Sequence, residues 1–160
     1  MVTLRRATSD DVDVVAALFG ALLAHHGPLD PALRVRANAG AEIRELVRAM
    51  LRDPDAAWWL AWPDGAAAGD APAGLCGARV DAAPPILEET LRGEISDLYV
   101  APDVRRRGMG RALTEAALAW LDARGARRVE VRVSPRNEAG RAFWRALGFA
   151  PFMDVLDRRR

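Results

Sequence analysis

The sequence lacks lysine altogether and has one cysteine, one tyrosine and two histidines among its 160 residues. The lone Cys76 cannot form an internal disulfide, and no cluster of Cys and His residues has the spacing of a zinc site. No stretch approaches the roughly 18 apolar residues needed to cross a bilayer, and the first residues contain no apolar signal segment. We therefore expect a cytoplasmic domain without a disulfide, a metal ion or a membrane span.

Apolar residues make up 51% of the chain and charged residues 28%, which excludes a disordered chain, a collagen-like repeat and a coiled-coil rod. The length suits a single domain over residues 1–160. Charge is unevenly distributed, because residues 1–103 carry a net charge of −7 and residues 104–160 one of +8. A basic second half suits a phosphorylated cofactor or a nucleic acid, and an acidic first half favours a cationic acceptor.

Apolar periodicity predicts both strands and helices along the chain. The expected strands are 2–7, 57–61, 74–80, 94–100, 128–133 and 149–156, and the expected helices are 12–24, 40–52, 110–124 and 138–147. The resulting order is β-α-α-β-β-β-α-β-α-β, which combines a meander with β-α-β crossovers. This order predicts an α/β fold with a mixed, mainly antiparallel central sheet and helices on both faces.

The most informative segment is Leu98–Leu113, where a predicted strand passes through Pro102 into an Arg-Gly turn that opens a helix. Gly108 and Gly110 permit close approach to the backbone. The first N–H groups of a helix have no partner within it and lie at its positive end, so the junction can bind a pyrophosphate. The alternative is an ordinary glycine turn with solvated arginines. The cationic residues around the turn are Arg105, Arg106, Arg107 and Arg111.

Two motifs resemble the signatures of one superfamily. Leu98-Tyr99-Val100-x-Pro102, followed by Arg105-x-x-Gly108-x-Gly110, is similar to the acyl-CoA loop of the GNAT superfamily of N-acetyltransferases. Asn137–Phe149, an Asn-led helix that ends in Gly-Phe, resembles the second signature, and the order of elements matches over residues 2–156. The resemblance implies a GNAT fold, acetyl-CoA as the cosubstrate and transfer of its acetyl group to a primary amine.

The resemblance also implies which residues hold the cofactor. In the family, amides of the loop bind the CoA pyrophosphate, the preceding strand pairs with pantetheine, and a strand amide near Leu98 polarises the thioester carbonyl. Asn137 would contact the pantetheine arm or the adenosine side. The implied cofactor-binding residues are Leu98, Tyr99, Val100, Arg105, Arg106, Arg107, Gly108, Met109, Gly110, Arg111, Asn137 and Trp144.

Two carboxylates of the strand before the loop are candidates for the base that deprotonates the amine. Glu94 corresponds to the position where some family members place a catalytic glutamate, and Asp97 is the second candidate. Strict alternation places Glu94 on one face of the strand and Asp97 with Tyr99 on the other. A bulge, which is frequent in this strand of the family, would break that alternation. The alternative for both carboxylates is a solvated position without a catalytic role.

The sequence departs from the family pattern in two places. Trp144 stands where the family commonly has a tyrosine that protonates the leaving thiolate, and an indole N–H is not acidic enough for that step. Tyr99 is the alternative acid, or the thiolate leaves without assistance. The segment after Phe149 is also short, so the last strand is either curtailed or supplied by a partner chain, as in a homodimer.

We expect the acceptor to be a small-molecule or peptide amine. One alternative is a non-catalytic acyl-CoA-binding or regulatory module, which the tryptophan at position 144 favours. A second is a nucleic-acid binder. The arginines of the basic half are spread over several elements without an aromatic strip on which bases could stack, so the sequence predicts no nucleic-acid partner.

Overall fold

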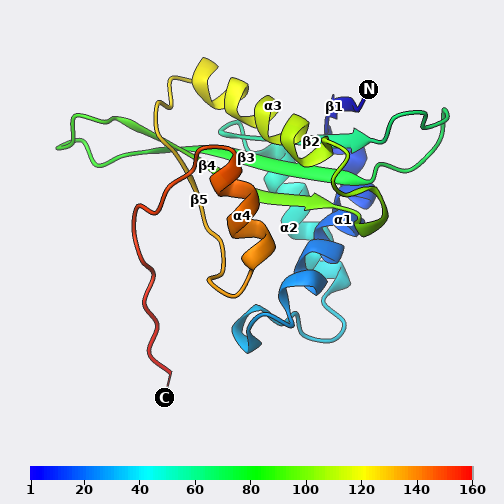
Figure 1. The fold of residues 1–160 in the computed structure, drawn as a ribbon, viewed down its shortest axis with the longest axis horizontal. Helices are drawn as coiled ribbons and strands as arrows, with labels where there is room; N and C mark the ends of the chain where they lie inside the picture. Colours follow the sequence, from blue (N-terminus) through cyan, green and yellow to red (C-terminus); the bar gives the residue numbers. More distant parts are fainter. Residues whose placement is uncertain (160) are drawn as a thin grey trace.

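A twisted sheet of five strands forms the centre of the computed structural model, which describes residues 1–159 (Figure 1). The strands are β1 (Thr3–Arg6), β2 (Ala56–Trp62), β3 (Gly74–Ala82), β4 (Leu91–Val100) and β5 (Val129–Val131). They lie in sequence order; the first three pairings are antiparallel, and β4 pairs with β5 in parallel. The expected mixed, mainly antiparallel sheet is therefore confirmed.

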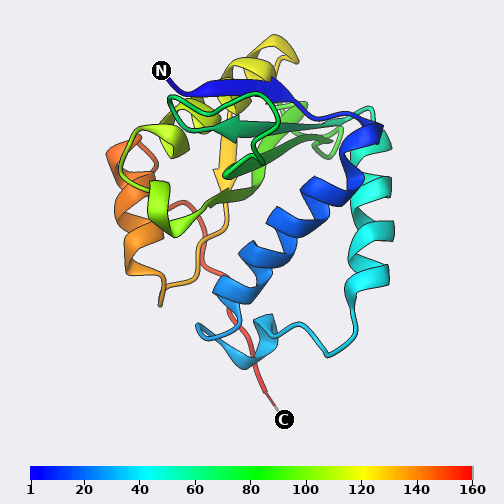
Figure 2. The same cartoon turned by 90° about the vertical axis from the view of Figure 1, so that its right-hand side faces the viewer.

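Helices cover both faces of the sheet, as the sequence predicts (Figure 2). One face is packed against α1 (Val12–His26) and α2 (Gly40–Arg52), and the other against α3 (Met109–Ala123) and α4 (Glu138–Ala146). Short 3-10 turns precede α1, α2 and α3. Among the described residues, no helix combines the length and the apolar character required to cross a bilayer.

The core consists of two layers because the central strands are buried on both sides. In β2, Trp58 and Leu60 pack toward α1 and α2, whereas Trp59 and Ala61 pack toward α3. Each of these four side chains is at most 8% exposed. A continuous apolar run in a strand is typical of this two-sided burial, which explains the sequence AAWWLAW of β2.

Local sequence explains how the helices begin. Thr8 and Asp11 form a reciprocal capping box ahead of α1. The side chain of Asn137 accepts a hydrogen bond from the backbone N–H of Gly140 at 2.9 Å and caps α4. Gly108 precedes α3 with a φ of +84° and provides no side-chain cap, so the first N–H groups of α3 have no capping side chain.

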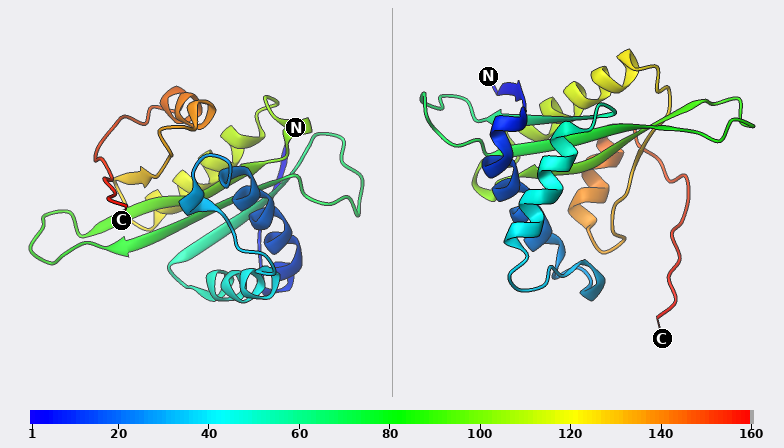
Figure 3. Two further views of the ribbon diagram at one scale, coloured as in Figure 1. Left: turned by 90° about the horizontal axis from the view of Figure 1, so that it is seen from below. Right: turned by 180° about the vertical axis from the view of Figure 1, so that it is seen from behind.

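The last predicted strand is wrong, because residues 149–159 form neither strand nor helix. Phe149 packs against Trp144 of α4, with ring centroids 5.1 Å apart, and Pro151 cannot donate to a ladder. The tail then continues as an extended segment (Figure 3), and Arg159 near its end pairs with Asp30 at 2.7 Å. The apolar side chains that it exposes are Phe152, Met153, Val155 and Leu156.

Candidate functional site

An irregularity in β4 determines which side chains share a face of the sheet. The register pairs Ala78 of β3 with Ile95 but Gly77 with Asp97, so Ser96 is an additional residue in β4. Such a bulge shifts the alternation by one position. In agreement, Ile95 packs in the α3 layer together with Leu98, although three positions separate them.

The bulge brings the three candidate catalytic residues to one face. Glu94, Asp97 and Tyr99 lie opposite Arg79, Gly77 and Leu75 of β3, in that order. Leu75 and Tyr99 belong to the layer under α1 and α2, and the ring of Trp58 from the same layer lies against Gly77. The expectation from strict alternation, that Glu94 faces away from Asp97 and Tyr99, is therefore wrong.

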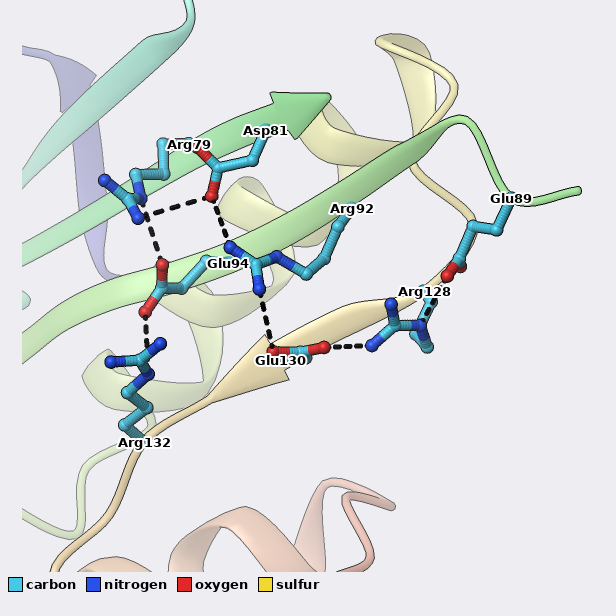
Figure 4. Close-up of polar contacts among 8 residues, drawn as sticks. All are labelled: Arg79, Asp81, Glu89, Arg92, Glu94, Arg128, Glu130 and Arg132. Atoms are coloured by element: carbon cyan, nitrogen blue, oxygen red, sulfur yellow. Dashed lines mark hydrogen bonds and ion pairs between the residues drawn. The ribbon is translucent and has the colours of Figure 1, made fainter. Parts of the chain in front are cut away.

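Arginines on both sides hold Glu94. Its side chain is 12% exposed. The Nε–H of Arg79 donates to Glu94 Oε2 at 3.0 Å, and Nε of Arg132 lies 3.8 Å from Oε1 (Figure 4). The carboxylate is thus partly buried but compensated by two cations, which is how a charge is tolerated at a sheet surface.

These ion pairs continue as a chain of alternating charges over three strands (Figure 4). Asp81 lies 3.3 Å from Arg79 and 2.8 Å from Arg92, and Arg92 reaches Glu130 of β5 at 3.6 Å. The chain ends with Arg128, which pairs with Glu130 and, at 2.7 Å, with Glu89. We call these eight residues the β3–β5 ion-pair network: Arg79, Asp81, Glu89, Arg92, Glu94, Arg128, Glu130 and Arg132.

Asp97 has a different environment, although it is only three positions away. Burial raises the pKa of its carboxyl above the ordinary value, and the charge of Glu94 raises it further. A hydrogen bond with Ser96 and the charge of Arg79 oppose these effects. A carboxyl with a raised pKa keeps its proton to a higher pH than a solvated aspartate does.

The edge of β4 is open beyond the bulge. In residues 1–159, β5 pairs only with Gly93, Glu94 and Ile95 of β4. The backbone of Leu98–Val100 on that side is therefore left without a strand partner, except that the carbonyl of Val100 accepts a hydrogen bond from Arg105 Nε at 2.8 Å. A free edge of this kind can pair with an extended ligand.

The same strand leads directly into the Arg-Gly turn. The side chains of Arg105, Arg106 and Arg107 are exposed. The side chain of Met109 is 2% exposed and belongs to the core, so this residue offers only its backbone to a ligand. A Cβ on Gly110 would lie 3.3 Å from the ring of Phe143, which shows that α4 packs against the beginning of α3.

The two remaining cofactor candidates have structural roles in α4. Asn137 uses its side-chain oxygen for the cap on Gly140, so its amide nitrogen is the group left for a ligand. Trp144 packs edge-on against Phe143 and Phe149, with ring centroids 5.1 Å apart in both pairs. The structure thus brings Glu94, Asp97, Tyr99, the open edge and the loop into one region. A pocket of about 730 Å³ beside Leu23 and Arg34 includes none of the candidate residues.

Sequence reasoning missed Arg79 and Arg132. Arg79 interrupts the apolar strand GLCGARV, which is the signal that could have drawn attention to it. Its pairing with Glu94 depends on the bulge and on the register of β3 with β4, neither of which can be read from that strand alone.

Comparison with known proteins shows the family. The model of the acetyltransferase (GNAT) family matches residues 29–149. The chain belongs to this family. The chain is 49% identical over 59 residues to mycothiol acetyltransferase of Beutenbergia cavernae. This match covers 37% of the chain and 20% of that protein. It is also 35% identical over 63 residues to N-alpha-acetyltransferase 30 of Schizosaccharomyces pombe, a match that covers 39% of the chain and 42% of that protein. The chain thus matches less than half the length of these relatives.

Solved structures share the fold over almost the whole chain. A tetramutant of the BH1408 protein from Bacillus halodurans superposes with a TM-score of 0.84 at 21% identity and covers 99% of both chains. The aminoglycoside N-acetyltransferase AAC(6')-Iy in complex with CoA gives 0.78 at 19% identity, and covers 100% of this chain and 95% of that one. At these identities the likeness shows the fold alone.

Proposed function

We propose that the protein is an acetyl-CoA-dependent N-acetyltransferase. The observation that carries the proposal is the course of β4: it runs from two carboxylates, past an open edge, into a helix start without a side-chain cap. Family membership and the fold shared with the CoA complex of AAC(6')-Iy support it. We further propose that residues 1–160 act as one cytoplasmic domain.

The described residues fit acetyl-CoA. The open edge at Leu98–Val100 suits the amide-containing pantetheine arm, and the amides of Gly108–Arg111 suit its pyrophosphate. The exposed side chains of Arg105, Arg106 and Arg107 add positive charge. Asn137 has one amide nitrogen to offer. Tyr99 offers its backbone to the pantetheine arm. Trp144 packs against the core and so helps to fix α4, which Asn137 caps.

Acetyl-CoA supplies an activated acetyl group, and the chain supplies positions and a base. We assign Glu94 as the base that takes the proton of the amine, with Asp97 as its neighbour on the same face. We assign to the backbone N–H of Leu98 the role of polarising the thioester carbonyl. Tyr99 is the candidate acid for the leaving thiolate, because Trp144 cannot donate a proton of useful acidity.

The acceptor in this proposal is a primary amine of a small molecule or peptide. The names of the relatives give two such classes, since one acts on an aminoglycoside and another is an N-alpha-acetyltransferase. The net charge of −7 over residues 1–103 favours an acceptor that is cationic near neutral pH.

The first test is thermal unfolding with acetyl-CoA, CoA and ATP. Ligand at about a hundred times its Kd adds about 2.7 kcal/mol of stability, which raises Tm by roughly 2–4 °C at this size. A shift with acetyl-CoA and CoA but not with ATP supports the proposal and leads to a screen of amines for thiol release. No shift at millimolar acetyl-CoA contradicts it.

A second candidate is a non-catalytic acyl-CoA-binding module. The packing of Trp144 between Phe143 and Phe149, where the family commonly has a tyrosine, favours this reading. The Glu94→Gln variant separates the two candidates. If it binds acetyl-CoA normally but loses turnover, the protein is an enzyme; if the wild type binds acetyl-CoA and acetylates no amine in the screen, it is a module.

We also propose a homodimer. Its support is the tail, where Phe152, Met153, Val155 and Leu156 are 62–90% exposed. Burial of such side chains against a second copy would remove them from water. Light scattering tests this proposal: a dimer mass for the wild type and a monomer mass for Leu156→Asp support it, and a monomer mass for the wild type contradicts it.

A further inference from the structure

The two oxygens of the Glu94 carboxylate have unequal partners. Oε2 accepts from Arg79 Nε at 3.0 Å, within hydrogen-bond distance. Oε1 is 3.8 Å from Arg132 Nε, which is an ion-pair distance but not a hydrogen bond. The side chain of Arg132 is 73% exposed, whereas that of Arg79 is 47% exposed. One oxygen is therefore held, and the other remains available.

Arg79 is itself fixed from behind. Its Nη2 lies 3.3 Å from Asp81, and Asp81 is held by Arg92 at 2.8 Å. Arg79 also stands directly opposite Glu94 in the register of β3 and β4. Because Arg79 is paired at both Nε and Nη2, few of its side-chain rotamers remain possible. Arg79 therefore holds its partner Glu94 in one position relative to the sheet.

The charge of Arg79 acts on both carboxylates of the site. It attracts Glu94 directly and also lowers the pKa of Asp97 against the effect of burial. Other titratable or charged groups surround Glu94 on the three strands: Asp81 on β3, Arg92, Asp97 and Tyr99 on β4, and Glu130 and Arg132 at β5. From α1, the layer over this face presents the apolar side chains of Val15, Phe19 and Leu22.

We propose that Arg79 is a positioning residue for acetyl transfer. It holds Oε2 of Glu94 through the hydrogen bond from Nε, so that Oε1 is free to take the proton of the acceptor amine. In that step the amine nitrogen forms a bond to the acetyl carbon, the carbon–sulfur bond breaks with its electron pair on the thiolate, and the N–H proton passes to Oε1. This inference rests on the proposed function.

The test compares two arginines of the same network. Arg79→Gln removes the partner of Glu94, whereas Arg128→Gln removes an arginine that also makes two ion pairs, with Glu89 and Glu130, but does not contact Glu94. Binding of acetyl-CoA is measured by calorimetry, and stability is measured as Tm. Turnover is followed as thiol release from acetyl-CoA with the best amine of the screen.

We expect Arg79→Gln to lower kcat about tenfold to a hundredfold, since a misplaced base costs about that much. The KM for acetyl-CoA should stay unchanged. Arg79→Lys should restore only part of kcat, because it keeps the charge but not the planar donor. Arg128→Gln should leave kcat unchanged.

The proposal is overturned if Arg79→Gln matches Arg128→Gln in kcat. If Arg79→Gln does not fold, Arg79→Lys and Asp81→Asn decide: wild-type kcat in both overturns the proposal, and a lowered kcat in both supports it. Loss of Tm alone, equal in the two arginine variants, shows a structural role and also overturns it. A wild type that shows no thermal shift with acetyl-CoA overturns the proposed function as well; a shift with unchanged Arg79→Gln overturns this inference alone.

Discussion

The proposed site has two ends that differ in composition, one on β4 and one in the loop that follows it. At residues 94–97, on the strand, it consists of side chains, which a bulge brings to one face and which arginines contact. At residues 105–111, after the strand, it consists of backbone, because Gly108 lies in the left-handed region and the side chain of Met109 is buried in the core. We therefore expect side-chain identity to determine the chemistry at the first end, and backbone conformation to determine cofactor binding at the second.

The largest effect is expected at the side-chain end. Glu94→Gln keeps the size of the side chain but cannot accept a proton. We expect turnover to fall about a hundredfold or more, the contribution typical of a positioned base, while the Kd for acetyl-CoA stays the same. Calorimetry measures binding and thiol release measures turnover. Parallel loss of both would contradict the separation of the two ends.

A backbone change tests the other end. Gly108 has a φ of +84°, and a side chain in this region costs about 1–2 kcal/mol. Gly108→Val should therefore weaken acetyl-CoA binding about tenfold, by the conversion of about 1.4 kcal/mol per factor of ten. Gly65→Val is the matched control, because Gly65 also has a positive φ, +77°, and open space around it but lies outside the site. Equal Kd values for the two variants would contradict the assignment of the loop as part of the acetyl-CoA site.

The pH dependence of stability tests the burial of Asp97. Its folded-state pKa is raised above the unfolded value, so the folded state binds the proton more tightly between the two, and stability falls as the pH rises through that window. Asp97→Asn removes this loss. We expect the variant to gain stability relative to the wild type above the raised pKa, and the gain to disappear below the ordinary pKa of aspartate. Denaturant unfolding at several pH values measures the difference, and a gain that is independent of pH would contradict the assignment.

The smallest effect is expected from the exposed arginines of the loop. If backbone amides hold the pyrophosphate, Arg106→Ala should raise the Kd for acetyl-CoA only about two- to fivefold, because an exposed ion pair contributes about 0–1 kcal/mol. High salt should reduce the difference further. Arg127→Ala, which removes an exposed arginine outside the loop, serves as the matched control. A rise in Kd of a hundredfold or more would show that arginine side chains, and not backbone amides, hold the pyrophosphate.

The sequence predicts much of this fold for a physical reason. Strands buried on both faces and amphipathic helices leave strong patterns, and nine of the ten expected elements are present in residues 1–159 with small shifts of their ends. The strand expected over 149–156 is absent because a local sequence pattern does not show whether a segment pairs with the sheet. Pro151 and the packing of Phe149 remove the tail from this sheet.

The site could be predicted only in part. Glu94, Asp97 and the loop could be predicted as candidates because motif and spacing are local. Their shared face could not be derived, because it depends on Ser96 as an extra residue against Gly77. The arginines Arg79 and Arg132 were missed for the same reason, since a cross-strand ion pair is set by register and leaves no local pattern.

The most direct test of the account is a crystal structure of the protein with CoA. We predict that the pyrophosphate lies on the amides of Gly108–Arg111, that the pantetheine pairs with the free edge at Leu98–Val100, and that the sulfur ends beside the bulge at Ser96, on the way to Glu94. CoA bound elsewhere, or with its sulfur remote from β4, would contradict the account.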